Sequence, residues 1–465
     1  MVHDQSQLGQ PSGYPGMNFL EKTRQEWKED PLLQKVVKNS GYLLSSNVFA
    51  MLLSIVQSIF AGRLLGVVGF GIIGTVTIFA STINRLLSFR MNELVVKYYG
   101  ESMSTHQTQR AASVIKAAAL AEGTSAVLSF IILVIFAPLA AARLTDNAAL
   151  APYFILYGTI ILANLVYESS TGILQVNNKF RSQAIINMAA SILTAGIIAW
   201  AFFAHRGILE VLIAYLAGKF LLGIGTIILG FGDLNRILGS GWWKTSFSYL
   251  PPFKELARFA FSTNLSSTII MLVRDNEILW IAYFLTPLDV GYAKTALAII
   301  NLVLIPITPL ISTTYPEINR AVVSKNWGQL RSLLKRVTLI SAGWTIFAGI
   351  GLVIFGRWLL GLYGPDFIPA YTPMLIFLVG LGFANILFWN RPLLLSLGLP
   401  MVPYRISLWC GMAKISLAFL LVTKLGINFE AFLLSAFFVI SVGSIILRGF
   451  AEIRKQEALS TGTGE

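Results

Sequence analysis

Residues 60–81 read FAGRLLGVVGFGIIGTVTIFAS, a stretch in which one apolar run ends and another begins on either side of Gly66. We predict that the flanking runs, over about 39–62 and 68–90, are helices, because each is long enough to cross roughly 30 Å of hydrocarbon. A strand of a membrane barrel would instead show about ten residues of alternating polarity. The stretch is therefore typical of a short turn between two transmembrane helices.

The same pattern of long apolar runs recurs along the whole 465-residue chain. Hydrophobic residues make up 55% of it and charged residues only 12%, against about 25% charged residues in soluble domains. We predict an all-α polytopic membrane protein with about twelve transmembrane helices rather than a soluble globular fold. The predicted spans are 39–62, 68–90, 112–138, 150–175, 182–204, 209–231, 256–284, 291–315, 333–356, 371–397, 402–424 and 428–449.

The net charge of +13 predicts how the chain is oriented in the membrane. With twelve spans, most of the Lys and Arg residues fall in the two tails and in alternate loops, and cytoplasmic loops are the ones that carry such an excess. Both termini are then cytoplasmic, and the positive charge requires no nucleic-acid partner. Residues 1–36 contain no apolar core of a secretory signal, so we expect this segment and 453–465 to be cytoplasmic tails.

The connection at 232–255 divides the chain into two halves of six predicted spans, at 37–231 and 256–452. It combines Trp242 and Trp243 with Lys244, a composition typical of the cytoplasmic membrane interface, although a linker that happens to be aromatic is the alternative. The halves share a motif: LGVVGFGIIGT from Leu65 and LTPLDVGYAKT from Leu285 place Leu, Gly and Thr at matching positions. Parallel six-helix repeats are typical of transporters with a pseudo-two-fold axis along the membrane normal.

The two halves also resemble a known family. Residues 60–81 resemble the first-loop signature of bacterial polysaccharide flippases, and so does VRDNEILWIAYFLTPLDVGYAKTALAIINLVLIPITPLISTTYPEINR at 273–320. The likeness rests on Gly-Phe-Gly around Phe70, Val-Gly-Tyr around Tyr292 and Tyr-Pro-Glu at 315–317, and it extends over about 36–452. The chain is similar to the polysaccharide branch of the multidrug/oligosaccharidyl-lipid/polysaccharide exporter superfamily.

This resemblance implies a fold and a function. Family members have two six-helix bundles that form a V around a central cavity. They move undecaprenyl-pyrophosphate-linked oligosaccharides across the prokaryotic inner membrane by alternating access. The resemblance further implies contact with membrane lipids, and association with the polysaccharide polymerase and glycosyltransferases of the pathway. A multidrug/cation antiporter of the same superfamily is the alternative.

An anionic, hydroxyl-rich cargo would lose its hydration in hydrocarbon, so the protein must offer a wet, cation-bearing cavity. Arg274 is the first candidate for such a cavity; a structural ion pair with Glu277 on the same helix face is the alternative. For Arg63 and Arg90, anchoring at the membrane surface is an equally reasonable or better explanation. The full set of predicted cavity residues is Arg274, Lys219, Lys414, Lys294, Arg63, Arg85 and Arg90.

Acidic residues at membrane depth are candidates for coupling transport to an ion gradient, because a buried carboxyl group can carry a proton. For Glu168, which is followed by Ser169 and Ser170, a hydrogen-bonded structural role is at least as reasonable. The coupling candidates are Asp275, Glu277, Glu168 and Glu122. Weaker candidates for stacking on sugar rings, since such residues more often lie at the membrane interface, are Tyr167, Trp280, Tyr283, Trp389 and Tyr404.

Other classes of function fit less well. The single cysteine, Cys410, and the three histidines offer no metal-ligand spacing, so we expect neither a metal nor a cofactor. We expect no enzyme activity either, because a membrane polymerase or glycosyltransferase usually needs a large outward loop and the predicted outward loops are short. A channel would need a filter-like segment. A cation antiporter would favour an acidic cavity, whereas the predicted cations at membrane depth favour an anionic cargo.

Overall fold

The structure is a computed structural model that describes residues 31–88, 91–252, 256 and 276–461. Every regular element within these ranges is a helix, in agreement with the prediction from the apolar runs. Ten helices in the described part of the chain are long and apolar enough to cross a membrane. The protein is therefore an all-α polytopic membrane protein.

The predicted number of twelve spans stays a prediction. Helix α2 (Pro31–Leu87) contains two of the predicted spans. They are separated by a kink at Gly66, where the backbone leaves the helical conformation with φ of 65° and ψ of −178°. Most of the predicted span 256–284 lies outside the described residues. So do Arg90, Arg274, Asp275 and most of the predicted tail 1–36.

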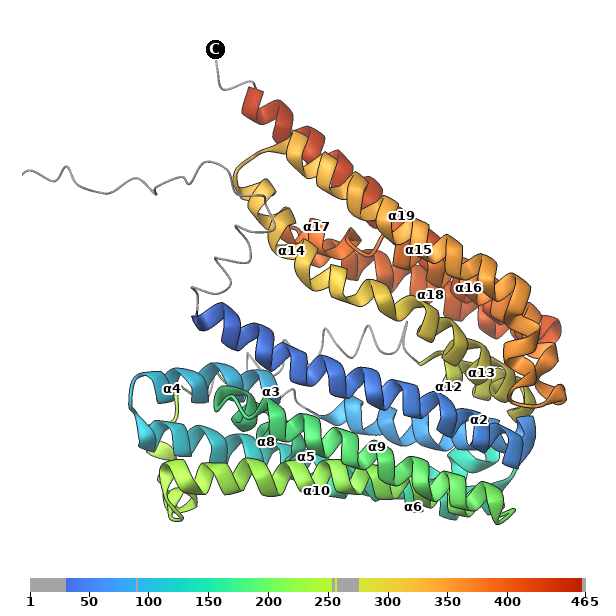
Figure 1. Cartoon of the computed structure of the whole chain (residues 1–465), viewed down its shortest axis with the longest axis horizontal. Coiled ribbons are helices and arrows are strands. Elements are labelled where there is room, and N and C mark those ends of the chain that lie inside the picture. Colours follow the sequence, from blue (N-terminus) through green and yellow to red (C-terminus); the bar gives the residue numbers. More distant parts are fainter. Residues whose placement is uncertain (1–30, 89–90, 253–255, 257–275, 462–465) are drawn as a thin grey trace, which may run out of the picture.

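The helices form two lobes that diverge like a V (Figure 1). The N-terminal lobe consists of α2, α3 (Met91–Leu94), η1 (Val95–Tyr99), α4 (Gly100–Ser104), α5 (Thr108–Leu144), η2 (Ala148–Leu150), α6 (Ala151–Gly158), α7 (Ile160–Ala163), α8 (Tyr167–Val176), α9 (Phe180–Phe203) and α10 (Ile208–Leu238). The C-terminal lobe consists of α12 (Glu277–Phe284), α13 (Pro287–Leu304), η6 (Ile305–Ile307), α14 (Thr308–Val323), α15 (Trp327–Gly361), η7 (Pro365–Ala370), α16 (Tyr371–Ile386), α17 (Asn390–Ser396), α18 (Met401–Leu425) and α19 (Ile427–Thr461).

The apolar core of the described residues joins the two lobes at one end. One buried cluster contains residues of both lobes, among them Phe70 of α2, Val290 of α13 and Phe367 of η7. We call this the sealed end. At the other end, which we call the open end, each lobe has a core of its own, around Tyr98 in the N-terminal lobe and around Trp327 in the C-terminal lobe. Apolar burial thus holds the lobes together at the sealed end while the open ends splay apart.

The backbone repeats between the lobes. In the turn before α5, the Gln107 N–H donates to the Ser102 carbonyl at 2.8 Å, and in the turn before α15 the Asn326 N–H donates to the Ala321 carbonyl at 2.9 Å. Turn residues with positive φ recur in the two lobes at a nearly constant spacing. Glycine adopts positive φ readily, and among other residues the short polar ones and His do so most often. The pairs are His106 and Lys325, Asp146 and Gly364, Asn178 and Gly398, and His205 and Gly426.

The connection between the lobes begins later than the sequence indicated. Helix α10 continues to Leu238, because Leu234 is buried in the open-end core of its lobe. The aromatic segment then forms two short turns, η3 (Trp242–Lys244) and η4 (Phe247–Tyr249). Trp242 stacks on Phe231 with ring centroids 5.6 Å apart, while the Trp243 side chain is 56% exposed. At the other terminus, α19 runs to Thr461, beyond the predicted end of the second bundle at 452.

Candidate functional site

Two glycines lie where the backbones of the two lobes approach each other closely. A Cβ atom on Gly71 would lie 2.0 Å from the Pro287 carbonyl oxygen, and one on Gly291 would lie 2.2 Å from the Val67 carbonyl oxygen. Only glycine allows a backbone to approach another this closely. Val67 and Gly71 occupy the places in the first half that Pro287 and Gly291 occupy in the second. The contact at the sealed end is therefore reciprocal, as a pseudo-two-fold axis requires.

Local sequence sets where this contact forms. In the C-terminal lobe, Thr286 caps the start of α13: its backbone N–H donates to Asp289 Oδ2 at 3.2 Å, and the Asp289 N–H donates to Thr286 Oγ1 at 3.4 Å. Pro287 occupies the first turn, where its missing N–H costs nothing. In the N-terminal lobe, Gly66 makes the equivalent turn through its positive φ. Different turn chemistry thus brings equivalent helix starts together.

Lys294 lies beside this contact, on the wall between the lobes. Its Nζ atom donates a hydrogen bond to the Phe70 carbonyl at 3.3 Å and lies 3.8 Å from the centre of the Phe70 ring. It forms no ion pair with any carboxylate in the described part of the chain. A cation of one lobe is thus held by the backbone and the aromatic face of the other lobe, where an anion would compete for it.

Arg63 ties the lobes together at the outer rim of the sealed end. Its Nε atom donates to the Leu362 carbonyl at 2.6 Å, at the carboxyl end of α15. Beside it, the Ser58 hydroxyl donates to the Tyr363 hydroxyl at 3.1 Å. A cation at a helix C-terminus satisfies an otherwise unpaired carbonyl and the helix dipole. The Arg63 contact is therefore structural in this conformation.

Glu277 pairs with Lys414. The pairing with Arg274 that the sequence suggested involves a residue outside the described part of the chain. The Lys414 ammonium hydrogen-bonds to the Glu277 carboxylate and lies 3.2 Å from Glu430 Oε1. The three side chains are at most 5% exposed and come from α12, α18 and α19. Lys414 thus lies inside the C-terminal lobe rather than on an open cavity wall. Sequence reasoning missed Glu430, although an acid close to the start of the last span was a visible signal.

Glu122 of α5 caps a helix inside the N-terminal lobe. Its two carboxylate oxygens accept from the backbone N–H groups of Glu168 at 2.7 Å and Ser169 at 2.9 Å, and Oε2 also accepts from the Ser169 hydroxyl at 2.6 Å. These donors belong to the first turn of α8, which begins where the fourth predicted span is broken after α7. The carboxylate satisfies N–H groups that the break leaves without helical partners.

Lys219 stands on the inward face of α10. Leu212 and Thr226, seven residues before and after it, are both buried and share its face. The Lys219 side chain is nevertheless exposed, and it forms no ion pair with a described carboxylate. Its role as a cavity lysine stays a prediction.

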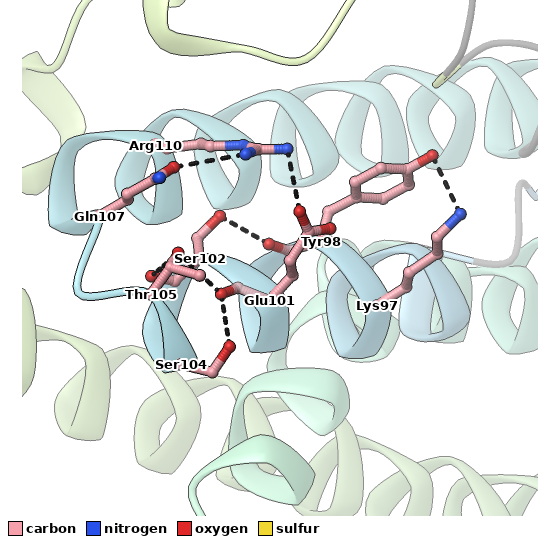
Figure 2. A network of polar contacts seen from close by, with 8 residues as sticks. All are labelled: Lys97, Tyr98, Glu101, Ser102, Ser104, Thr105, Gln107 and Arg110. Carbon is pink, nitrogen blue, oxygen red and sulfur yellow. Dashed lines mark hydrogen bonds and ion pairs between the residues drawn. The ribbon is translucent and has the colours of Figure 1, made fainter. Parts of the chain in front are cut away.

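The open end of the N-terminal lobe carries a polar network (Figure 2). Arg110 bridges Glu101, at 3.5 Å, and the Gln107 side chain, at 3.3 Å, while Lys97 donates to the Tyr98 hydroxyl at 3.3 Å. The network fixes the turn between α4 and α5, and it gives both Arg110 and Lys97 partners within the same lobe. Arg85, in the last turn of α2, is exposed, which fits a surface anchor as well as a cavity residue.

A cavity in the C-terminal lobe has a volume of about 540 Å³. Arg391 is its only charged lining residue among those described, and Tyr404, Ser407 and Asn385 contribute neutral polar groups. The Arg391 guanidinium lies 5.6 Å from the Tyr404 ring centre. Arg391 was not among the predicted cavity residues; the Asn-Arg-Pro sequence inside the tenth predicted span was the available signal.

A smaller pocket of about 200 Å³ lies in the N-terminal lobe, lined by Asn47, Tyr167, Gln183 and Asn187 among others. Its described lining includes no charged residue. Two of the aromatic candidates thus reach a pocket, Tyr167 here and Tyr404 in the C-terminal lobe. Trp389 is instead buried in packing, with its indole N–H donated to the Thr338 hydroxyl at 2.7 Å.

Residues 36–322 match the family described as polysaccharide biosynthesis protein. The match covers more than half of the chain and includes both copies of the repeated motif. The chain belongs to this family. It is also 24% identical, over 359 residues, to the inner membrane protein YghQ of Escherichia coli (strain K12), a match that covers 74% of this chain and 97% of YghQ.

Solved structures confirm the transporter-like fold of this polysaccharide biosynthesis protein. An inward-facing multidrug resistance MATE family transporter of the MOP superfamily has a TM-score of 0.65 at 13% identity, covering 90% of this chain and 96% of that one. The lipid II flippase MurJ, in an inward closed conformation, has a TM-score of 0.65 at 14% identity, covering 89% of each chain. The fold is thus shared by a drug transporter and a lipid flippase.

The site residues of this family member fall into two groups. Glu122 caps a helix inside its lobe, and Glu277 and Glu430 share Lys414 as their counter-charge inside the C-terminal lobe. Lys219, Lys294 and Arg391 lie next to open space or the other lobe and lack a described carboxylate partner. No group of three or more His, Cys, Asp or Glu residues in the described part of the chain could hold a metal ion.

Proposed function

We propose that this protein is a flippase that moves undecaprenyl-phosphate- or pyrophosphate-linked oligosaccharide across the inner membrane for surface polysaccharide biosynthesis. Its family membership supports a role in polysaccharide biosynthesis, and its fold supports transport. The two lobes would exchange access by rocking about the reciprocal glycine contact.

The distribution of charged side chains supports an anionic cargo. Two of the predicted acidic candidates, Glu122 and Glu277, are engaged inside a lobe, whereas Lys219 and Lys294 have no described acidic partner. Unpaired cations at membrane depth are costly unless they meet water or an anion. An anionic head group would satisfy them, whereas a cationic drug would not.

The open end is the cytoplasmic one in this proposal. Its turns and helix ends carry Lys97, Arg110, Lys325 and Arg331, the excess of positive charge expected on the cytoplasmic side. Both termini then lie in the cytoplasm, and the V is open to substrate made on that side. The name of YghQ, an inner membrane protein, fits this location.

The two moving bundles would be residues 37–231 and 256–452, joined by the interfacial linker 232–255. A coupling ion would act at the buried Glu277–Lys414–Glu430 cluster, because two carboxylates there share one lysine. Partners would be the lipid-linked substrate, membrane lipids, and the polymerase and glycosyltransferases of the pathway. Neither catalysis nor nucleic-acid binding belongs to the proposal.

A reconstituted flipping assay tests this function. Purified protein in liposomes would be given a fluorescent undecaprenyl-pyrophosphate oligosaccharide, and its movement between leaflets would be followed by quenching from one side. Lys294→Gln, at the contact between the lobes, should reduce the rate. Lys424→Gln, at the exposed end of α18 near the sealed end, is the matched control and should not.

Two outcomes would decide against the proposal. If no movement of the lipid occurs while the same vesicles export drug cations, the multidrug/cation antiporter is the better assignment; the equal TM-score of the MATE transporter makes it the second candidate. If the lipid moves but Lys294→Gln has no effect, the flippase stands and the role of Lys294 is wrong.

A further inference from the structure

Arg391 lines the cavity of the C-terminal lobe and has no acidic partner among the described residues. It is half-buried, and among the described residues no hydrogen bond or ion pair forms with its guanidinium group. The guanidinium group lies over the Tyr404 ring, 5.6 Å from the ring centre. A guanidinium group has five N–H donors in a planar fork, and removing it from water without an acceptor is costly. The guanidinium fork of Arg391 therefore has N–H donors that an anionic ligand could accept from.

The rest of the cavity indicates what kind of anion. Asn301, Asn385, Ser407 and Ser441 line it with neutral donors and acceptors, and no described lining residue is acidic. Such groups suit hydroxyls and the oxygens of a phosphate ester. With a single arginine, the lining is matched to one bidentate phosphate group.

The apolar part of the lining distinguishes a lipid from a soluble phosphate. Phe388, Phe437 and Phe438 share the cavity with Ile311 and Ile445. These residues would gain from covering an isoprenoid chain, but would have no role in binding a small sugar phosphate. The cavity is therefore amphipathic in the way that a lipid phosphate is.

The cavity also lies at a suitable depth. Arg391 belongs to α17, on the open-end side of the break that separates α16 from α17. The neighbouring Leu393 and Leu394 are part of the open-end core of the C-terminal lobe. A head group in the leaflet next to the open end would thus reach Arg391 without crossing the membrane.

We infer that Arg391 and this cavity form the site that receives the phosphate group of the lipid-linked substrate, with the first isoprene units against the phenylalanines. This inference rests on the proposed flippase function and makes Arg391 a specificity-determining residue for lipid phosphate. The pocket in the N-terminal lobe, whose described lining is uncharged, would not share this role.

The test measures binding by the purified full-length protein in detergent, with geranyl phosphate, geraniol and glucose 1-phosphate as probes. Wild type should bind geranyl phosphate more tightly than the other two. Arg391→Gln should weaken geranyl phosphate binding by about tenfold or more while leaving geraniol binding unchanged, since it removes only the charge-assisted contact. Arg405→Gln, an exposed arginine on α18 outside the cavity lining, is the matched control and should bind as wild type does.

Two further variants keep the test decisive if Arg391→Gln fails to fold. Arg391→Lys retains the charge but not the fork, and should bind geranyl phosphate with intermediate affinity. Ser407→Phe leaves the arginine in place but fills the cavity, and should weaken both geranyl probes together. Wild-type affinity for geranyl phosphate in these variants would overturn the site.

Other results separate this inference from the proposed function. If Arg391→Gln retains the preference for geranyl phosphate over geraniol, the site assignment is wrong even when flipping occurs. If glucose 1-phosphate binds as tightly as geranyl phosphate, the cavity is a site for soluble anions and the lipid assignment is wrong. If binding depends on Arg391 but the reconstituted protein moves no lipid, the site stands and the flippase function fails.

Discussion

Lys294 lies against Gly74, the residue that occupies its own position in the other half of the repeat. A Cβ atom on Gly74 would come within 2.8 Å of the Lys294 Cδ atom, so glycine leaves the space that the lysine fills. The sealed end is therefore symmetric in its backbone but asymmetric in its chemistry. One half supplies a cation, and the other supplies room for it together with the Phe70 carbonyl and ring.

The reciprocal glycine contact should control closure of the sealed end. Gly291→Ala would place a methyl group against the Val67 carbonyl, and overpacking of this kind costs about 1–3 kcal/mol. We expect the sealed conformation to lose population, and flipping to slow, while the protein still folds. Reactivity of Ser58→Cys toward a membrane-impermeant thiol reagent, in a Cys410→Ser background, should rise because Ser58 lies beside Tyr363 at this end. Gly343→Ala, in open space on α15, is the control; equal behaviour of the two variants would contradict the gate.

The buried charge cluster should tolerate loss of an acid better than loss of its lysine. Lys414→Met leaves Glu277 and Glu430 buried without a counter-charge, and breaking a buried pair in this way costs about 3–5 kcal/mol. Glu430→Gln removes one of two carboxylates that share one ammonium, so its cost should be smaller. Thermal unfolding in detergent should rank wild type above Glu430→Gln and both above Lys414→Met. The opposite order would show that Glu277 and Glu430 do not depend on Lys414 as their counter-charge.

Glu122 should matter for stability more than for cargo. Glu122→Ala leaves two backbone N–H groups and the Ser169 hydroxyl without their acceptor, which should cost about 3 kcal/mol or more. Glu317→Ala breaks only a partly exposed ion pair with Arg320 and should cost less than about 1 kcal/mol. Thermal unfolding distinguishes the two. A stable Glu122→Ala protein that has lost coupling to an ion gradient would instead support the carboxylate as an ion carrier.

Accessibility should separate the two faces of α10. In a Cys410→Ser background, Lys219→Cys should react with a charged thiol reagent, because the side chain is exposed on the inward face. Ile228, nine residues later, lies on the opposite face and is 65% exposed where lipid would cover it. Ile228→Cys should stay unreactive, since a thiol in hydrocarbon does not ionise. Protection of both positions would place Lys219 away from water.

The sequence was enough for the class of fold and for the family. Long apolar runs can only be helices in a membrane, because their backbone groups have no other partners there. The Leu, Gly and Thr residues that repeat around Gly71 and Gly291 also indicated two related halves. Glycine is required at the equivalent position of each half because the two backbones approach closely there. These properties depend on local composition and pattern, which the sequence contains in full.

The partners of the charged residues were decided by the tertiary structure alone. The apolar sequence around Lys219, Lys294 and Lys414 places these residues at or near membrane depth. It does not show which neighbouring helix each side chain faces. Lys414 meets two acids from other helices, whereas Lys294 meets a carbonyl 224 residues away. Arg391 stood within a predicted span, yet only the packing of α13, α14 and α16–α19 makes the cavity around it. Burial and pairing of a charge depend on which distant helices surround it, and no single segment contains that information.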